Sequence, residues 1–163
     1  MFTIVLPQHP TGKALAETVD QGRLPADLRI LIVDDEVEIA ETLEEILRLN
    51  GDHADIAANG SEGLARALSA TYDLILSDIR MPQLDGPSLY EALRRERPEM
   101  LHRIAFITGD ALSPEIRSFL TRSGVPYLEK PFLASDVLRL LSEATERRRA
   151  TTDESEDRRK QAG

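Results

Sequence analysis

Residues 29–36 read RILIVDDE, a short apolar run that is followed at once by three acidic residues. Apolar side chains then recur at helical spacing over residues 39–47, and Asn50 and Gly51 follow, a pair suited to a left-handed helix stop. An apolar run of strand length followed by a segment of helical period is typical of one unit of a parallel sheet flanked by helices. This stretch therefore predicts a strand, an acidic turn and an amphipathic helix.

The same alternation recurs along the chain. The expected strands are Arg29 to Val33, His53 to Ala57, Asp73 to Ser77, Arg103 to Ile107 and Val125 to Leu128. The later helices are expected after Asn59-Gly60-Ser61, after Asp85-Gly86-Pro87, from about Ser113-Pro114 to Gly124, and from about Ala134. Five such units with right-handed crossovers predict a flavodoxin-like α/β fold, a doubly wound five-stranded parallel sheet of order 2-1-3-4-5 with five helices.

The length of 163 residues suits one domain with tails. Residues 1–28 contain an apolar start and then a Pro- and Gly-containing stretch, so we expect an N-terminal extension or linker there. We place the domain at residues 29–147. Residues 148–163 mix basic and acidic runs without an apolar stripe, and we expect a disordered charged tail.

Composition narrows the classes of function. A formal net charge of −9 argues against a nucleic-acid-binding surface, because phosphate backbones repel an anionic partner. The chain has no cysteine, which excludes disulfides and thiolate metal sites. The apolar runs are only strand-sized and no signal peptide is recognisable, so we expect neither a membrane span nor membrane association, and a cytoplasmic location.

Polar residues follow four of the five expected strands. Asp34 and Asp35 follow the first, Asp78 the third, Thr108 the fourth, and Lys130 the fifth. In doubly wound sheets the carboxyl ends of the strands share one edge, where ligands bind. We therefore expect three carboxylates, a hydroxyl and an ammonium group to converge there.

Three clustered carboxylates require a counter-ion. At about 4 Å and an effective dielectric constant of about 20, each pair of carboxylates would repel by roughly 4 kcal/mol. With only oxygen ligands and no His or Cys nearby in the sequence, a hard divalent cation is expected, and room for water favours Mg²⁺ over Ca²⁺. The sequence therefore predicts a magnesium site.

Four motifs in register carry a family resemblance. They are Ile32-Val33-Asp34-Asp35-Glu36, then Leu76-Ser77-Asp78-Ile79-Arg80-Met81-Pro82 with Asp85-Gly86, then Phe106-Ile107-Thr108-Gly109-Asp110, and Tyr127-Leu128-Glu129-Lys130-Pro131-Phe132. Together they resemble the receiver domains of response regulators and hybrid histidine kinases, over about Leu28 to Arg147. Each motif alone is a weak signal, whereas the set in order is specific.

The resemblance implies a regulatory domain rather than a multiple-turnover enzyme. Asp78 would take a phosphoryl group from a histidine kinase, a histidine phosphotransfer protein or a small acyl phosphate. Asp35 would bind Mg²⁺ directly and Asp34 mainly through water, with Asp78 and the backbone carbonyl of Arg80 as further ligands. Only self-phosphorylation and autodephosphorylation would be expected as activities.

The resemblance also assigns the remaining site residues. Lys130 and Thr108 would each bind a phosphoryl oxygen, and Tyr127 matches the aromatic switch position. Gly109 leaves space beside the site. The Lys130-Pro131 bond would be cis, which aims the lysine at the acceptor.

Other interpretations stay open for the individual residues. Asp34 and Asp35 could cap the first helix, Asp78 could cap a turn, Lys130 could be solvated, and Tyr127 could be plain core. A haloacid-dehalogenase-like Mg²⁺-dependent phosphatase also uses an aspartate nucleophile, but in an Asp-x-Asp sequence after the first strand. A receiver that works without phosphorylation, or one with its own DNA-binding domain, is disfavoured by the intact motifs and the short tail.

Residues 2–7, FTIVLP, resemble the closing strand of a histidine-kinase ATPase domain. In hybrid kinases this strand stands just upstream of a receiver, so the chain is interpreted either as a stand-alone regulator or as the receiver of a hybrid kinase. No histidine stands in the setting of a phosphorylated kinase histidine. The kinase, the downstream protein partner and the oligomeric state, for which a homodimer stays open, are not encoded in these motifs.

Overall fold

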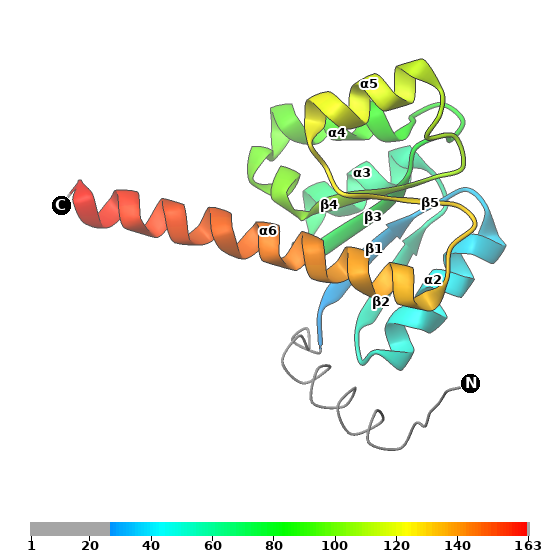
Figure 1. Ribbon diagram of the computed structural model, residues 1–163, viewed down its shortest axis with the longest axis horizontal. Coiled ribbons are helices and arrows are strands. Elements are labelled where there is room, and N and C mark those ends of the chain that lie inside the picture. The colour runs from blue at the N-terminus through cyan, green and yellow to red at the C-terminus, as the bar shows by residue number, and fades with distance from the viewer. Residues whose placement is uncertain (1–26, 163) are drawn as a thin grey trace, which may run out of the picture.

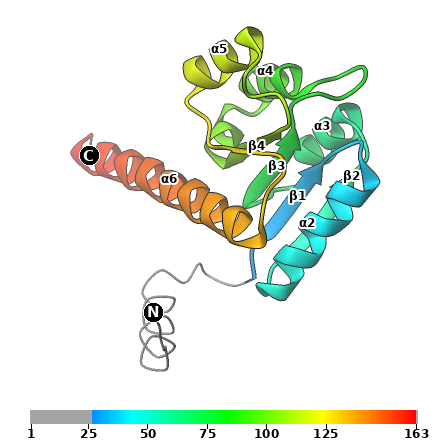
Figure 2. The same cartoon turned by 45° about the vertical axis from the view of Figure 1, so that its right-hand side comes forward.

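The computed structural model of the protein describes residues 27–162, so residues 2–7 and most of the expected linker lie outside it. Within that range five parallel strands form one sheet in the order β2-β1-β3-β4-β5, as predicted. The strands are β1 (Arg29–Val33), β2 (His53–Ala57), β3 (Leu74–Asp78), β4 (Ile104–Thr108) and β5 (Tyr127–Glu129). Figure 2 shows the arrows of β1 and β3 pointing the same way, so their carboxyl ends share one edge.

Helices cover both faces of the sheet (Figure 1). They are α2 (Val37–Leu49), α3 (Gly60–Ser69), α4 (Gly86–Glu96), α5 (Pro114–Ser123) and α6 (Ala134–Gln161), with a 3₁₀ helix, η1 (Pro98–Arg103), between α4 and β4. The three helices α3, α4 and α5 lie on one face, and α2 and α6 lie on the other. This arrangement confirms the doubly wound fold.

A hydrophobic core lies on each face of the sheet, and the alternation of side chains along the strands explains why there are two. In β1, Leu31 and Val33 pack toward α3 and α4, whereas Ile30 and Ile32 pack toward α2 and α6. Successive side chains of a strand point to opposite faces, so a strand covered on both sides must be apolar at nearly every position. The buried run of β1 therefore follows from its place in the centre of the sheet.

Local signals place the helix ends. Asn59 and Asp85 cap α3 and α4 by accepting hydrogen bonds from the N–H groups of Glu62 and Ser88, at 2.8 and 2.9 Å. Gly124 ends α5 in the left-handed conformation. Asn59 and Asp85 account for the agreement with the predicted starts of α3 and α4, and Gly124 accounts for the predicted end of α5.

Several details differ from the expected elements. Strands β3 and β4 each begin and end one residue later than expected. The 3₁₀ helix η1 was not predicted, because its Pro98 start and six-residue length leave no clear period. Strand β5 is three residues long and begins at Tyr127 instead of Val125. It is an edge strand that pairs with residues 106–108 of β4.

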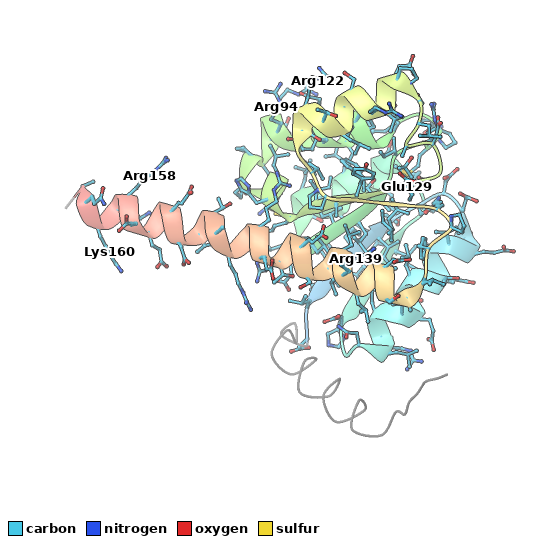
Figure 3. All side chains as sticks on the ribbon, viewed as in Figure 1. Arg94, Arg122, Glu129, Arg139, Arg158 and Lys160 are labelled. Carbon is cyan, nitrogen blue, oxygen red and sulfur yellow. The ribbon has the colours of Figure 1, made fainter. Side chains whose placement is uncertain are left out.

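The expectation of a disordered tail at residues 148–163 is wrong for the described part, because α6 continues without a break to Gln161. The first half of α6 packs on the sheet and provides the costly helix nucleus, after which Ala, Glu, Arg and Gln residues favour propagation. Arg148 also pairs with Asp73 at 2.6 Å. The prediction of disorder was based on the charge runs and the missing apolar stripe, and it did not include the helix propensity of these residues. Figure 3 shows Arg158 and Lys160 projecting from the part of α6 that extends beyond the sheet.

A membrane-spanning helix is not found within residues 27–162, where none combines sufficient length with sufficient apolar character.

Gly86, the first residue of α4, lies against the backbone at the end of β3. A Cβ atom there would stand 2.8 Å from the carbonyl oxygen of Asp78 and 2.9 Å from the Cα atom of Ile79. Both neighbours are main-chain atoms, so neither can turn away. We expect Gly86→Ala to lower the free energy of unfolding by about 1–3 kcal/mol, measured by urea denaturation.

Gly109→Ala is the matched control. The nearest atom to its added Cβ would be Lys130 Cδ at 4.0 Å, an ordinary contact. Its free energy of unfolding should change by less than about 0.5 kcal/mol. Equal effects of the two substitutions would contradict the close approach of α4 to β3.

Candidate functional site

The predicted acidic residues meet at the carboxyl edge of the sheet. Asp34 and Asp35 follow β1, and Asp78 is the last residue of β3. One ligand oxygen from each lies within 4.8 Å of the others. The parallel register of β1 with β3 brings the two strand ends level, and the cluster follows from that register.

Asp78 is held in a fixed orientation inside this cluster. Its side chain is only 6% exposed. Its Oδ1 accepts a 2.8 Å hydrogen bond from the backbone N–H of Ile79, and its Oδ2 lies 3.5 Å from Nζ of Lys130. The oxygen that faces the lysine is therefore the one left available for chemistry.

Asp34 is more deeply buried, at 2% exposure, and only half satisfied. Its Oδ1 accepts a 2.9 Å hydrogen bond from the N–H of Glu36. Its Oδ2 has no hydrogen-bond partner and lies 3.6 Å from Nζ of Lys130. A buried carboxylate oxygen without a hydrogen-bond partner is costly, and a cation beside it would relieve that cost.

Lys130 reaches the cluster from the other side. Its backbone N–H donates to the carbonyl oxygen of Thr108 at 2.8 Å, and the Lys130-Pro131 bond is cis, as predicted. Its Nζ also contacts Oε1 of Glu36 at 3.0 Å. Burial lowers the pKa of Lys130, but the hydrogen bond to Glu36 and the charges of Asp78 and Asp34 outweigh it and raise that pKa. The side chain is therefore a cation.

The carboxylates are hard to ionise together. Burial, and after it the charge of Asp34, raises the pKa of Asp78 from 3.8 to about 6, although Lys130 acts in the opposite direction. Burial also raises the pKa of Asp34 above its ordinary value, and the hydrogen bond from Glu36 opposes this. One lysine does not compensate three acidic groups, so the cluster has an excess of negative charge.

The donors in this cluster suit a hard divalent cation. They are carboxylate oxygens, with one exposed member, Asp35, beside two buried ones. Oδ2 of Asp34 has no hydrogen-bond partner among residues 27–162, and a bound ion would explain this. Such a set, open to water on one side, is typical of Mg²⁺ sites.

The other predicted residues surround the cluster. Thr108 ends β4, is buried, and its Oγ1 accepts a 3.0 Å hydrogen bond from the N–H of Asp110. Gly109 leaves open space beside Lys130. Tyr127 begins β5 with its side chain 45% exposed, at a groove of about 260 Å³ between β5 and α5. It is therefore not a plain core residue in this structure.

The motifs did not assign two contacts around the site. Glu36 pairs with Lys130, although it is adjacent to the acidic pair in the sequence and could have been considered. The side chain of Arg80 pairs with Asp110, with its Nε 2.8 Å from Oδ2 of that residue. These two residues lie 30 positions apart, and a pairing at that separation has no local sequence signal.

This fold and this edge define a class of small α/β proteins that gather carboxylates and a lysine at the ends of parallel strands. The sequence matches the response regulator receiver domain family over residues 30–142, and the chain belongs to that family. It is therefore a receiver domain of two-component systems, a regulatory family in which phosphorylation of an aspartate is typical.

Individual relatives of this chain support the family assignment. A response regulator receiver protein of Anaeromyxobacter sp. strain Fw109-5 is 40% identical over 114 residues, covering 69% of this chain and 46% of that protein. The transcriptional regulatory protein DltR of Streptococcus agalactiae is 33% identical over 111 residues, covering 68% and 49%. The chain thus spans about half the length of these relatives.

A solved receiver-domain structure is also similar to this chain. The CheY-like receiver domain from Methanospirillum hungatei JF-1 superposes with a TM-score of 0.70 at 33% identity. The match covers 77% of this chain and 99% of that one.

The raised pKa of Asp78 predicts a pH-dependent stability. The folded state holds its proton up to about pH 6, whereas the unfolded chain releases it near 3.8. The stabilising effect is complete below the lower value and is lost as the pH rises through 6. In EDTA, Asp78→Asn should therefore be more stable than the wild type at pH 7.5, by roughly 2–3 kcal/mol.

Urea denaturation of both proteins at pH 7.5 and pH 4 measures this difference. The gap should close toward pH 4, where the wild-type carboxyl group is neutral. A gap that stays constant with pH would show that Asp78 ionises without cost in the folded protein.

Proposed function

We propose that Asp78 is the phosphorylated aspartate of this receiver domain. The observation that carries the proposal is the position of Lys130, whose Nζ lies 3.5 Å from Asp78 and 3.6 Å from Asp34. A cation at that distance from the acceptor oxygen can pair with an incoming phosphoryl group. With a pKa of about 6, Asp78 is mainly a carboxylate at neutral pH and can act as a nucleophile.

The reaction can be written for the residues present. Oδ2 of Asp78, the oxygen not bound by Ile79, attacks the phosphorus atom of a phosphohistidine or a small acyl phosphate. The new P–O bond forms as the bond to the donor breaks, and the leaving group keeps the electron pair. Lys130 pairs with one phosphoryl oxygen. The Thr108 hydroxyl turns from Asp110 to donate to another.

Mg²⁺ would be held by Asp34, Asp35 and Asp78, together with the backbone carbonyl of Arg80. It would supply the positive charge that lets an anionic acceptor approach an anionic donor. Oδ2 of Asp34, a buried oxygen without a hydrogen bond from the described residues, supports this assignment.

The proposed partners are a histidine kinase or a histidine phosphotransfer protein. Exposed apolar side chains stand at the helix ends next to the acidic site: Val37 opens α2 at 62% exposure and Leu133 precedes α6 at 70%. A partner that covers these two side chains would remove apolar surface from water beside the acidic site. The proposed location is the cytoplasm, and a hybrid-kinase origin stays a hypothesis from residues 2–7.

Phosphorylation should be confined to one residue and require a metal. Incubation with acetyl phosphate and Mg²⁺ should add one phosphoryl group, measured by intact mass, and Asp78→Asn should abolish the addition. Asp27→Asn is the matched control, because Asp27 is exposed at the opposite edge of the sheet, and it should be labelled normally.

EDTA should prevent the labelling of the wild type. Labelling of Asp78→Asn at the wild-type level would refute the assignment. Repeated turnover of a phosphate monoester would instead favour the phosphatase alternative.

The signal would leave the site through Thr108 and Tyr127. An acyl phosphate adds roughly one negative charge and new acceptor oxygens, which Thr108 and Lys130 approach when the loops after β4 and β5 move inward. Movement of Thr108 vacates space that the half-exposed ring of Tyr127 can enter. The surface formed by α5, β5 and α6 would then change between two populations, with a bias of about 1–3 kcal/mol.

Amide chemical shifts recorded with and without beryllofluoride test this route. Changes should extend from Thr108 through Ser123 and from Tyr127 into α6, and Tyr127→Ala should shorten that range. Shifts confined to the acidic cluster would mean that the output surface lies elsewhere, for example at α2.

A further inference from the structure

A second polar cavity lies at the opposite edge of the sheet from the acidic cluster. It has a volume of about 460 Å³, and its lining comes from the start of β3, the end of η1 and the extended part of α6. The lining residues are Asp73, Arg103, Arg148, Arg149, Thr152 and Asp153. A smaller hollow of about 170 Å³ shares Arg103 and Arg148 with it. Neither belongs to the phosphorylation site.

Positive charge exceeds negative charge in this cavity. Three arginines face two aspartates there, in a chain whose net charge is −9. Asp73 is already engaged: its Oδ1 pairs with Arg148 at 2.6 Å and its Oδ2 accepts the N–H of Arg29 at 2.8 Å. Asp153 is the other carboxylate of the lining. Glu99, which lies near Arg103 in the adjoining hollow, is already paired with Arg97 at 2.9 Å.

Arg103 and Arg149 retain free donor groups among the described residues. Arg103 donates from Nη1 to the carbonyl oxygen of Tyr72 at 2.9 Å. Arg149 makes no ion pair or side-chain hydrogen bond with any residue in the range 27–162. A guanidinium group has five N–H donors. Burial lowers the pKa of Arg103, and the charge of Arg148 lowers it further. The cavity therefore has a positive potential that its own carboxylates leave uncompensated.

We propose that this cavity binds a phosphate-bearing small molecule, with Arg103 and Arg149 as its main donors. Its volume lies in the range of small-ligand sites. The planar guanidinium fork matches the oxygens of a phosphate group, and two forks from different elements suit a diphosphate better than a single phosphate.

A ligand held there would connect α6 to the body of the domain. Arg149 belongs to the part of α6 beyond the sheet, and Arg103 ends η1, just before β4. The ligand would add a second link beside the pair between Arg148 and Asp73. The cavity is separated from the acceptor by the length of β3, roughly 16 Å at 3.3 Å per residue. The cavity therefore shares no residue with the acidic cluster.

Isothermal titration of the full chain with inorganic pyrophosphate and with inorganic phosphate tests the proposal. The buffer holds EDTA, so that no metal brings phosphate to the acidic cluster, and KCl keeps the ionic strength constant. Saturable binding of pyrophosphate is expected, at least fivefold weaker in Arg149→Gln. Asp153→Asn removes the opposing carboxylate and should tighten binding at least twofold.

Arg94→Gln is the control, because Arg94 is an exposed arginine of α4 paired with Glu91. It should bind pyrophosphate like the wild type, and so should Asp78→Asn. Tighter binding of pyrophosphate than of phosphate assigns a diphosphate ligand, and equal binding assigns a single phosphate group. Absence of saturable binding, equal loss in Arg94→Gln and Arg149→Gln, or tighter binding of a polyglutamate peptide than of pyrophosphate would overturn the proposal.

Discussion

The mutual repulsion of Asp34, Asp35 and Asp78 around one lysine is the constraint on which the functional edge depends. Parallel pairing of β1 with β3 brings these carboxylates together whether or not they are neutralised. Lys130 compensates part of the charge from the end of β5. The remaining excess raises the pKa of Asp78 and suits the site to cations and phosphoryl groups. The cost of ionising Asp78 lowers the stability of the folded protein, and the same excess of negative charge makes this edge reactive toward cations and phosphoryl groups.

The rest of the fold tolerates that edge because its two cores are well packed. The same strands that end in aspartate are apolar on both faces, so the sheet is held by α2 and α6 on one side and by α3, α4 and α5 on the other. Gly86 lets α4 approach the backbone of Asp78, which couples the position of a surface helix to the acceptor. The end of β3 therefore forms both the close contact with α4 and the acidic site residue Asp78.

Helix α6 joins two differently charged regions of the molecule. It begins near the acidic cluster, with Leu133 as its cap residue, and lines the cavity at Arg148 and Arg149 where it extends beyond the sheet. An element that touches both ends of a sheet can respond to events at either. The acidic cluster and the cavity at Arg148 and Arg149 would then both act on helix α6.

The sequence by itself determined the fold class and the members of the acidic site, because these depend on local periodicity and on the residues that follow each strand. The sequence favoured the strand order only as the commonest arrangement of five such units. It also predicted the cis bond before Pro131. The course of α6 beyond the sheet, the pairing of Arg80 with Asp110 and the cavity at Arg103 were decided only by the tertiary structure. The pairing and the cavity each depend on side chains 30 or more residues apart, and contacts at that separation have no periodic signal in the sequence. The extension of α6 depends on the packing of its first half on the sheet, after which the helix propensity of the following residues carries it on.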